Sequence, residues 1–272
     1  MSAPPPPPAG LARVIPLEWE DVRNACQRTS TRFVEVLRSA SDPHARIRGL
    51  DWTVAELAAH VVSLTARYEP FLKGQGNAFY ASMSDMNAQE LDAFSRLSLD
   101  ELADHLERGT SSLLSLCPSG EAPARFFDLE SDCASAIALY VEELLVHGLD
   151  IARTVGSPWM ITRAEALIAL AGLVVAMPKF VDPKSTRGFR ATYELRLRGG
   201  PTFSLAIDDR AATFSPGPVR NADCRISVDP IALLLTGTNR QWRWKTLFTG
   251  KTSAFGRKPW LALRFNSIFV DS

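Results

Sequence analysis

The chain has 272 residues, a length typical of one large domain or two ordinary ones. Hydrophobic residues make up 46% of it and charged residues 22%, so the chain has enough apolar surface to fold and is not disordered as a whole. Its 30 basic and 30 acidic residues give no net charge, which argues against a nucleic-acid partner, because such binding depends on excess positive charge.

The first residues include an uninterrupted proline run, Pro4–Pro8, without the charged and apolar regions of a signal peptide. This composition predicts a disordered tail over residues 1–15. The longest apolar run, residues 166–177, is too short for a membrane span, which needs about 20 residues. The four cysteines lack the spacing of a metal site or a disulfide framework, which favours reduced thiols and a cytoplasmic protein. They are Cys26, Cys117, Cys133 and Cys224.

Apolar residues recur at helical spacing from Leu17 to Gly156. Four long helices are predicted, over residues 17–40, 53–67, 98–116 and 132–154. A loop over residues 68–83 and a short helix over residues 87–97 are predicted between the second and third of them. Capping boxes, formed by a Thr or Ser three residues before a Glu, mark the starts of the second and third long helices. Four long helices of this kind predict an antiparallel bundle.

The pattern changes in the second half of the chain. Thr162 and Glu165 form another capping box and open a helix that ends at Pro178. Short strands are then predicted over residues 191–198, 201–208, 210–216 and 223–229, followed by helices over 230–235 and 258–269. The fold class is therefore α followed by α+β. We expect a helical bundle over residues 16–158, and a linking helix with an α+β domain over residues 159–272.

Two histidines lie on apolar helix faces, His60 in the second long helix and His147 in the fourth. Glu143 shares the face of His147, because residues four apart on a helix are neighbours. A buried carboxylate is costly unless it is paired or binds a metal. Two histidines and one glutamate from facing helices match a catalytic zinc site with an open fourth position. Asp150, one turn after His147, could orient that ligand as an outer acceptor.

Simpler interpretations apply to each residue alone. A Glu and a His four residues apart most often form a surface ion pair, and a single inward histidine is most often a core residue. Glu142 points away from His147 along the helix and is a weaker ligand candidate. His44, in a loop, and His105, beside an apolar face, are predicted not to be ligands. The metal hypothesis depends on all three candidates facing inward together.

Two segments, DWTVAELAAHVVSL and VEELLVHGLDIARTVGSP, resemble the signature blocks of the mycothiol-dependent maleylpyruvate isomerase family, in the same order. The resemblance covers about residues 17–158 and implies a DinB-like four-helix bundle. It also implies that zinc is bound by His60, Glu143 and His147. The segment LFTGKTSAFGRKPWLALRFNSIF resembles the end of a sterol-carrier-like (SCP2-like) domain. The preceding LLLTGTNRQW departs from the usual L-x-G-R pattern of that domain, since Thr238 and Asn239 separate Gly237 from Arg240.

The resemblance implies an enzyme that uses zinc and mycothiol, a sugar-linked cysteine of actinobacteria. Zinc with an open position holds a thiol as the nucleophilic thiolate. The partners are then a low-molecular-weight thiol and a small electrophile. Arg257, in the Gly-rich turn of the FGRKPW block, is the candidate that binds an anionic group of the substrate, and a plain surface arginine is the simpler interpretation. We expect a monomer or a weak homodimer.

The alternatives left open differ in the reaction that follows thiol addition. An isomerase eliminates the thiol after bond rotation, whereas an S-transferase in detoxification or antibiotic biosynthesis stops at addition or displacement. A non-catalytic metal-binding protein and a lipid carrier are the remaining alternatives.

Overall fold

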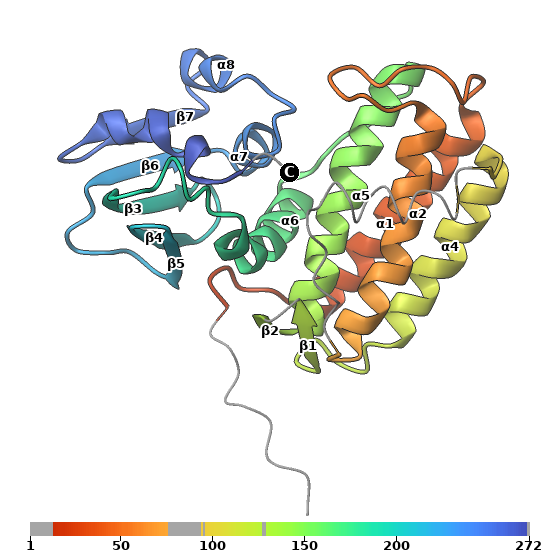
Figure 1. The fold of residues 1–272 in the computed structure, drawn as a ribbon, viewed down its shortest axis with the longest axis horizontal. Helices are drawn as coiled ribbons and strands as arrows, with labels where there is room; N and C mark the ends of the chain where they lie inside the picture. Colours follow the sequence, from red (N-terminus) through yellow and green to blue (C-terminus); the bar gives the residue numbers. More distant parts are fainter. Residues whose placement is uncertain (1–12, 76–93, 95, 127–128, 271–272) are drawn as a thin grey trace, which may run out of the picture.

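The computed structural model describes residues 13–75, 94, 96–126 and 129–270, and Figure 1 shows a helical part beside a part that contains a sheet. The predicted order of α followed by α+β is confirmed. The helical part is a four-helix bundle of α1 (Trp19–Ser39), α2 (Val54–Leu72), α4 (Leu99–Ser115) and α5 (Cys133–Val155). Among the described residues, no helix combines the length and apolarity needed to cross a membrane.

The helix starts follow the sequence signals. Thr53 accepts a hydrogen bond from the Glu56 backbone N–H and Glu56 accepts one in return, and the same capping box opens α4 at Ser98. Gly156 ends α5 with a left-handed backbone, φ 72°, which glycine adopts without steric strain. The predicted helix boundaries in the bundle are therefore correct at the starts of α2 and α4 and at the end of α5.

Three expectations in this half need correction. The loop predicted from residue 68 begins later, because burial of Tyr68 and Phe71 extends α2 past Pro70 to Leu72. Residues 13–15 are packed and not part of a disordered tail: Ile15 is 3% exposed, and Arg13 pairs with Asp132 at 2.9 Å. A small hairpin of β1 (Pro123–Phe126) and β2 (Leu129–Asp132) was not predicted. The proline run and most of the predicted helix over residues 87–97 lie outside the described residues.

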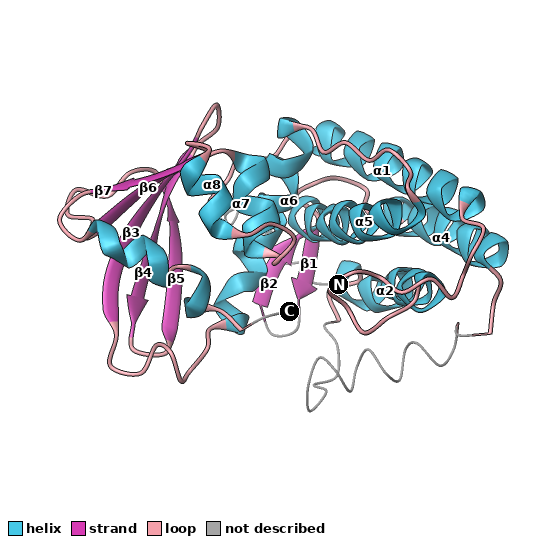
Figure 2. Ribbon diagram, turned by 90° about the horizontal axis from the view of Figure 1, so that it is seen from above, coloured by secondary structure: helices cyan, strands magenta, loops and turns pink. Residues whose placement is uncertain are grey.

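A five-stranded sheet forms the second half of the chain (Figure 2). Its strand order is β5-β4-β3-β6-β7, and only the β3–β6 pair is parallel. The strands are β3 (Arg190–Leu197), β4 (Thr202–Asp208), β5 (Ala211–Pro216), β6 (Cys224–Val228) and β7 (Thr252–Phe255). The register places Leu195 opposite Phe203 and Leu205 opposite Phe214. The first hairpin turns at the glycines 199–200, as expected, whereas the second turns at residues 209–210, one residue later than the Asp208-Asp209 turn expected from the sequence.

The last predicted helix, over residues 258–269, is wrong. The chain there forms two short 3-10 helices, η2 (Pro259–Arg264) and η3 (Asn266–Ile268). Their buried side chains are Leu261, Phe265 and Ile268, four and then three residues apart. This spacing fits consecutive 3-10 turns as well as an α-helix, so periodicity alone could not separate the two. Two further short helices, α7 (Pro230–Gly237) and α8 (Arg243–Phe248), precede β7.

Helix α6 (Arg163–Ala176) lies between the two halves, packed against α5 on one side and α7 on the other (Figures 1 and 2). The 3-10 turn η1 (Met177–Phe180) continues it toward the sheet. Because α6 contacts both halves, it forms a layer between the helical bundle and the sheet-containing half. The division of the chain at residue 158 stays a prediction.

We expect Gly172→Ala to destabilise the protein by about 1–3 kcal/mol, the usual effect of overpacking. A Cβ atom at Gly172 of α6 would lie 2.2 Å from the backbone nitrogen of Leu139 in α5, so the helices would have to separate. The clash should exceed the roughly 1 kcal/mol that alanine gains over glycine in a helix. Gly237→Ala in α7 is the control, because nothing lies within 4 Å of its Cβ position. The urea midpoints of unfolding are measured for wild type and both variants. Equal midpoints for Gly172→Ala and wild type would contradict close packing of α5 against α6.

Candidate metal centre

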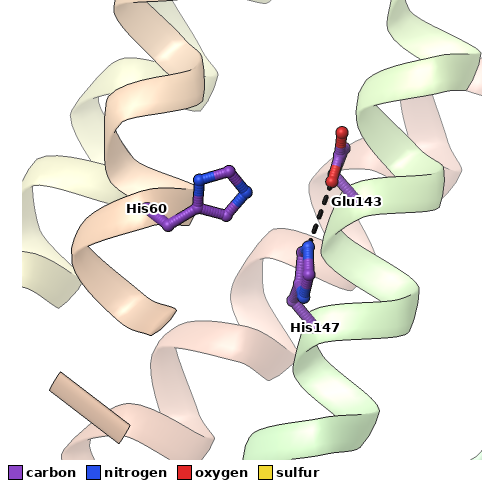
Figure 3. Close-up of side chains that lie close together, drawn as sticks. All are labelled: His60, Glu143 and His147. Carbon is purple, nitrogen blue, oxygen red and sulfur yellow. Dashed lines mark ion pairs between the residues drawn. The ribbon is translucent and has the colours of Figure 1, made fainter. Parts of the chain in front are cut away.

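Helices α2 and α5 bring His60, Glu143 and His147 together inside the bundle (Figure 3). Each residue offers one nitrogen or oxygen atom, and the three atoms all lie within 4.8 Å of one another. His60 projects from α2 toward the pair on α5, and the two imidazole rings lie 5.2 Å apart at 88°. The structure therefore brings together the three residues that helical spacing in the sequence had indicated as ligand candidates. Metal binding by these residues stays a prediction.

Packing around the cluster fixes the two rings. The Trp52 ring lies 4.9 Å from the ring of His60, which is 5% exposed. His147 Nε2 lies 3.2 Å from a Glu143 carboxylate oxygen, and His147 Nδ1 lies 3.6 Å from Asp150, slightly beyond hydrogen-bond length. Asp150 is thus near the position expected of an outer acceptor. The small spread of donor atoms is consistent with a preformed site.

Charge interactions separate the pKa values of the three groups. Burial and the nearby charge of His147 lower the pKa of His60 to about 3. Burial also opposes the charged forms of Glu143 and His147, but their mutual interaction outweighs it. Asp150 and the charge of Glu143 raise the pKa of His147 to about 9. The charge of His147 in turn lowers the pKa of Glu143 to about 2. These shifts favour an imidazolium beside a carboxylate on α5 when no metal is bound, so a cation competes with a proton for His147.

The chemistry of the donor set tests whether a metal fits here. Within the described residues, His60 Nδ1 and His147 Nδ1 are buried without a hydrogen-bond partner. His147 Nε2 faces Glu143 while its Nδ1 faces Asp150, so the unpaired Nδ1 atoms call for a further hydrogen-bond partner such as water and do not themselves mark a metal position. Two imidazoles with one carboxylate are also the ligand set of known catalytic zinc sites. The residues present therefore fit a divalent metal of the zinc type.

A cavity of about 430 Å³ opens beside the cluster and extends between the bundle, α6 and the sheet. Besides the three candidates, its bundle end is lined by Arg67, which is 6% exposed, and by Glu142. Glu142 is 7% exposed, and burial beside the Glu143 charge raises its pKa to about 8. Glu142, predicted to be a weaker ligand candidate because it points away from His147, lines the same cavity.

The structure does not bring Arg257 to this cavity. Its side chain is 66% exposed and pairs with Asp223 at 2.7 Å on the surface of the second half. Arg240 lines the cavity instead, with a side chain 12% exposed and 2.9 Å from Asp150. The Arg257 hypothesis relied on the Gly-rich turn in sequence, whereas the TGTNR segment that departs from the SCP2-like pattern carries the cavity arginine.

His44 and His105, predicted not to be ligands, are both exposed and outside the cluster. The ring of His105 lies 5.7 Å from the ring of Phe94. The four cysteines are free and buried, and none belongs to the cluster.

Comparisons with known proteins agree with the helical bundle. Residues 23–152 match the family model described as the mycothiol maleylpyruvate isomerase N-terminal domain. Two solved structures of a mycothiol-dependent maleylpyruvate isomerase, one of them a mutant, have TM-scores of 0.52 and 0.51 with 16% and 14% identity. Each match covers 89% of this chain and 97% of the other chain.

Other comparisons add less. A structure titled UbiJ-SCP2 ubiquinone synthesis protein matches with a TM-score of 0.30 and 15% identity, over 36% of this chain and 85% of that one. No curated protein sequence matches the chain. The matched family model covers α2, most of α5 and every member of the histidine–glutamate cluster. Residues 23–152, which form most of the helical bundle, therefore resemble the mycothiol maleylpyruvate isomerase N-terminal domain.

Proposed function

We propose that this protein is an enzyme that binds zinc at His60, Glu143 and His147 and uses mycothiol to act on a small electrophile. The observation that carries the proposal is the cluster itself: two histidines and one glutamate at the end of a cavity large enough for a substrate. The two isomerase structures that share the fold support mycothiol as the thiol. Maleylpyruvate-type cis–trans isomerisation and S-transfer both use this arrangement.

When bound, the metal supplies a Lewis acid that keeps a thiol deprotonated at neutral pH. The residues of the chain hold and surround it. Arg240 binds Asp150, which keeps that carboxylate beside His147. Trp52 packs on His60 and limits its ring rotation. The positive charge of Arg67 helps to keep the pKa of Glu143 low, so that its carboxylate stays ionised.

The cavity adds positioning and exclusion of water. Arg67 and Arg240 place positive charge at its polar end, where an anionic group of the substrate can bind, in place of the Arg257 of the sequence hypothesis. The adjoining apolar walls keep water from competing with the thiol. A carrier without chemistry does not need a histidine–glutamate cluster at one end of its cavity, which favours the enzyme. Free cysteines throughout are consistent with a reducing, cytoplasmic setting.

The nucleophile is tested by a variant in which all four cysteines become Ala or Ser. We expect this variant to keep zinc and mycothiol-dependent turnover, because all four thiols lie outside the cluster. Burial raises the pKa of Cys26 to about 12, so that thiol is not reactive at neutral pH. The assay follows loss of the electrophile with and without mycothiol, at a temperature at which circular dichroism shows the variant folded. Loss of turnover in a folded, zinc-loaded variant would assign the reaction to a protein thiol.

A further inference from the structure

The cavity beside the cluster has two chemically different ends. Its charged lining residues come from the bundle, apart from Arg240 on the loop after α7. Its other walls come from α6, η1, the sheet and the C-terminal segment. These walls contribute apolar side chains such as Leu173, Met177, Leu195, Phe203, Phe214 and Phe269. We call this second region the apolar chamber.

Several chamber side chains are only partly covered by the protein. Leu173 and Met177 on the α6 side, and Phe214 and Phe269 on the sheet side, are each half-buried. The rings of Phe214 and Phe269 are nearly parallel, at 18° with centroids 6.3 Å apart. They form an aromatic wall that faces open space rather than a closed core.

A small doubly charged substrate does not use this chamber. Its carboxylates would bind at the arginine end, and water would fill a space that offers it few hydrogen-bond partners. Displacement of such water by an apolar group strengthens binding, by about fourfold for each methylene removed from water. The chamber therefore selects for an apolar group joined to the part of the substrate that reacts.

We propose that the substrate is an amphiphilic electrophile, with its reactive carbon at the histidine–glutamate cluster and an aliphatic or aromatic body in the apolar chamber. The substrate class rests on the proposed function, whereas apolar binding in the chamber can be tested without it. A cavity of about 430 Å³ accommodates a medium-sized organic molecule together with part of the thiol. Specificity then depends on α6 and the sheet, and reactivity on the bundle.

The first experiment uses alkyl hydroxamic acids, which join a zinc-binding head to an apolar tail. Titration calorimetry on the zinc-loaded protein compares acetohydroxamic, butanohydroxamic, hexanohydroxamic and octanohydroxamic acids. We expect affinity to rise by about three- to fourfold per methylene until the chamber is full. Equal affinity across the series, or weaker binding of the longer acids, overturns the proposal.

The second experiment needs no metal. Fluorescence of the neutral dye N-phenyl-1-naphthylamine is measured with the metal-free protein, which should bind it. Leu173→Gln should weaken that binding about tenfold, because it places an amide in the chamber wall. Leu167→Gln is the matched control, a half-buried leucine of the same helix that is outside the cavity lining, and it should bind the dye like wild type. No dye binding, or equal loss in both variants, overturns the proposal.

These results separate the substrate class from the reaction. If the protein binds the dye as expected but has neither zinc nor thiol-dependent turnover, the apolar chamber is supported and the proposed function is overturned. Thiol-dependent turnover with a higher kcat/KM for a small dianionic electrophile than for its alkyl-extended analogues keeps the function and overturns the substrate class.

Discussion

His147→Ala should lower the affinity for zinc by more than about 100-fold. Even a change in an outer partner of a metal ligand typically lowers affinity 10–100-fold, and this substitution removes one of the three donors of the cluster. The bundle should stay folded, because its core is formed by apolar side chains of four helices. Zinc content is measured by mass spectrometry after dialysis against a weak chelator, and folding by circular dichroism.

His105→Ala is the matched control for this experiment. It removes an exposed histidine of α4 that lies outside the cluster, so zinc content should equal that of wild type. Retention of one zinc per chain in the folded His147→Ala protein would eliminate the three-residue site.

Arg240→Ala should destabilise the folded protein by about 3–5 kcal/mol, the usual effect of removing one partner from a buried ion pair. Arg240 and Asp150 are 12% and 7% exposed, and two guanidinium nitrogens approach the same carboxylate oxygen at 2.9 and 3.1 Å. Truncation leaves the Asp150 carboxylate buried beside His147 without its main partner. Urea unfolding monitored by circular dichroism measures the difference.

The surface ion pair of Arg257 with Asp223 provides the comparison. Its arginine is 66% exposed, so Arg257→Ala should change the free energy of unfolding by no more than about 1 kcal/mol. Combining Asp150→Ala with Arg240→Ala should recover part of the loss, because no unpaired charge then remains in the interior. Equal effects of the two single arginine variants would show that the Arg240 pair contributes no more than a surface contact.

Short-range signals in the sequence were sufficient for the starts of three helices and for the pairing of Glu143 with His147. Capping boxes at Thr53, Ser98 and Thr162 mark true helix starts, since side chain and backbone there are only three residues apart. Helical spacing likewise placed Glu143 and His147 on one face. Each of these features depends on a single helix and its immediate neighbours.

Features that depend on distant partners were missed. The position of Arg240 beside Asp150 joins residues 90 apart in sequence, and nothing near either residue indicates the other. Pro70 suggested an early end for α2, but tertiary burial of Phe71 overrides that local signal. The cavity itself is formed by α6 and the sheet around the bundle, so no single segment predicts it.

The intermediate position of α6 has a consequence for synthesis on the ribosome. The bundle helices are complete at Val155, but the α5 surface around Leu139 is covered only when Gly172 and its neighbours arrive. During translation that apolar strip is exposed for the time needed to add the α6 residues and free them from the exit tunnel. Exposed apolar surface of this kind favours aggregation and chaperone binding. The nascent bundle is therefore expected to need protection for longer than a helical domain whose last helix completes its own core.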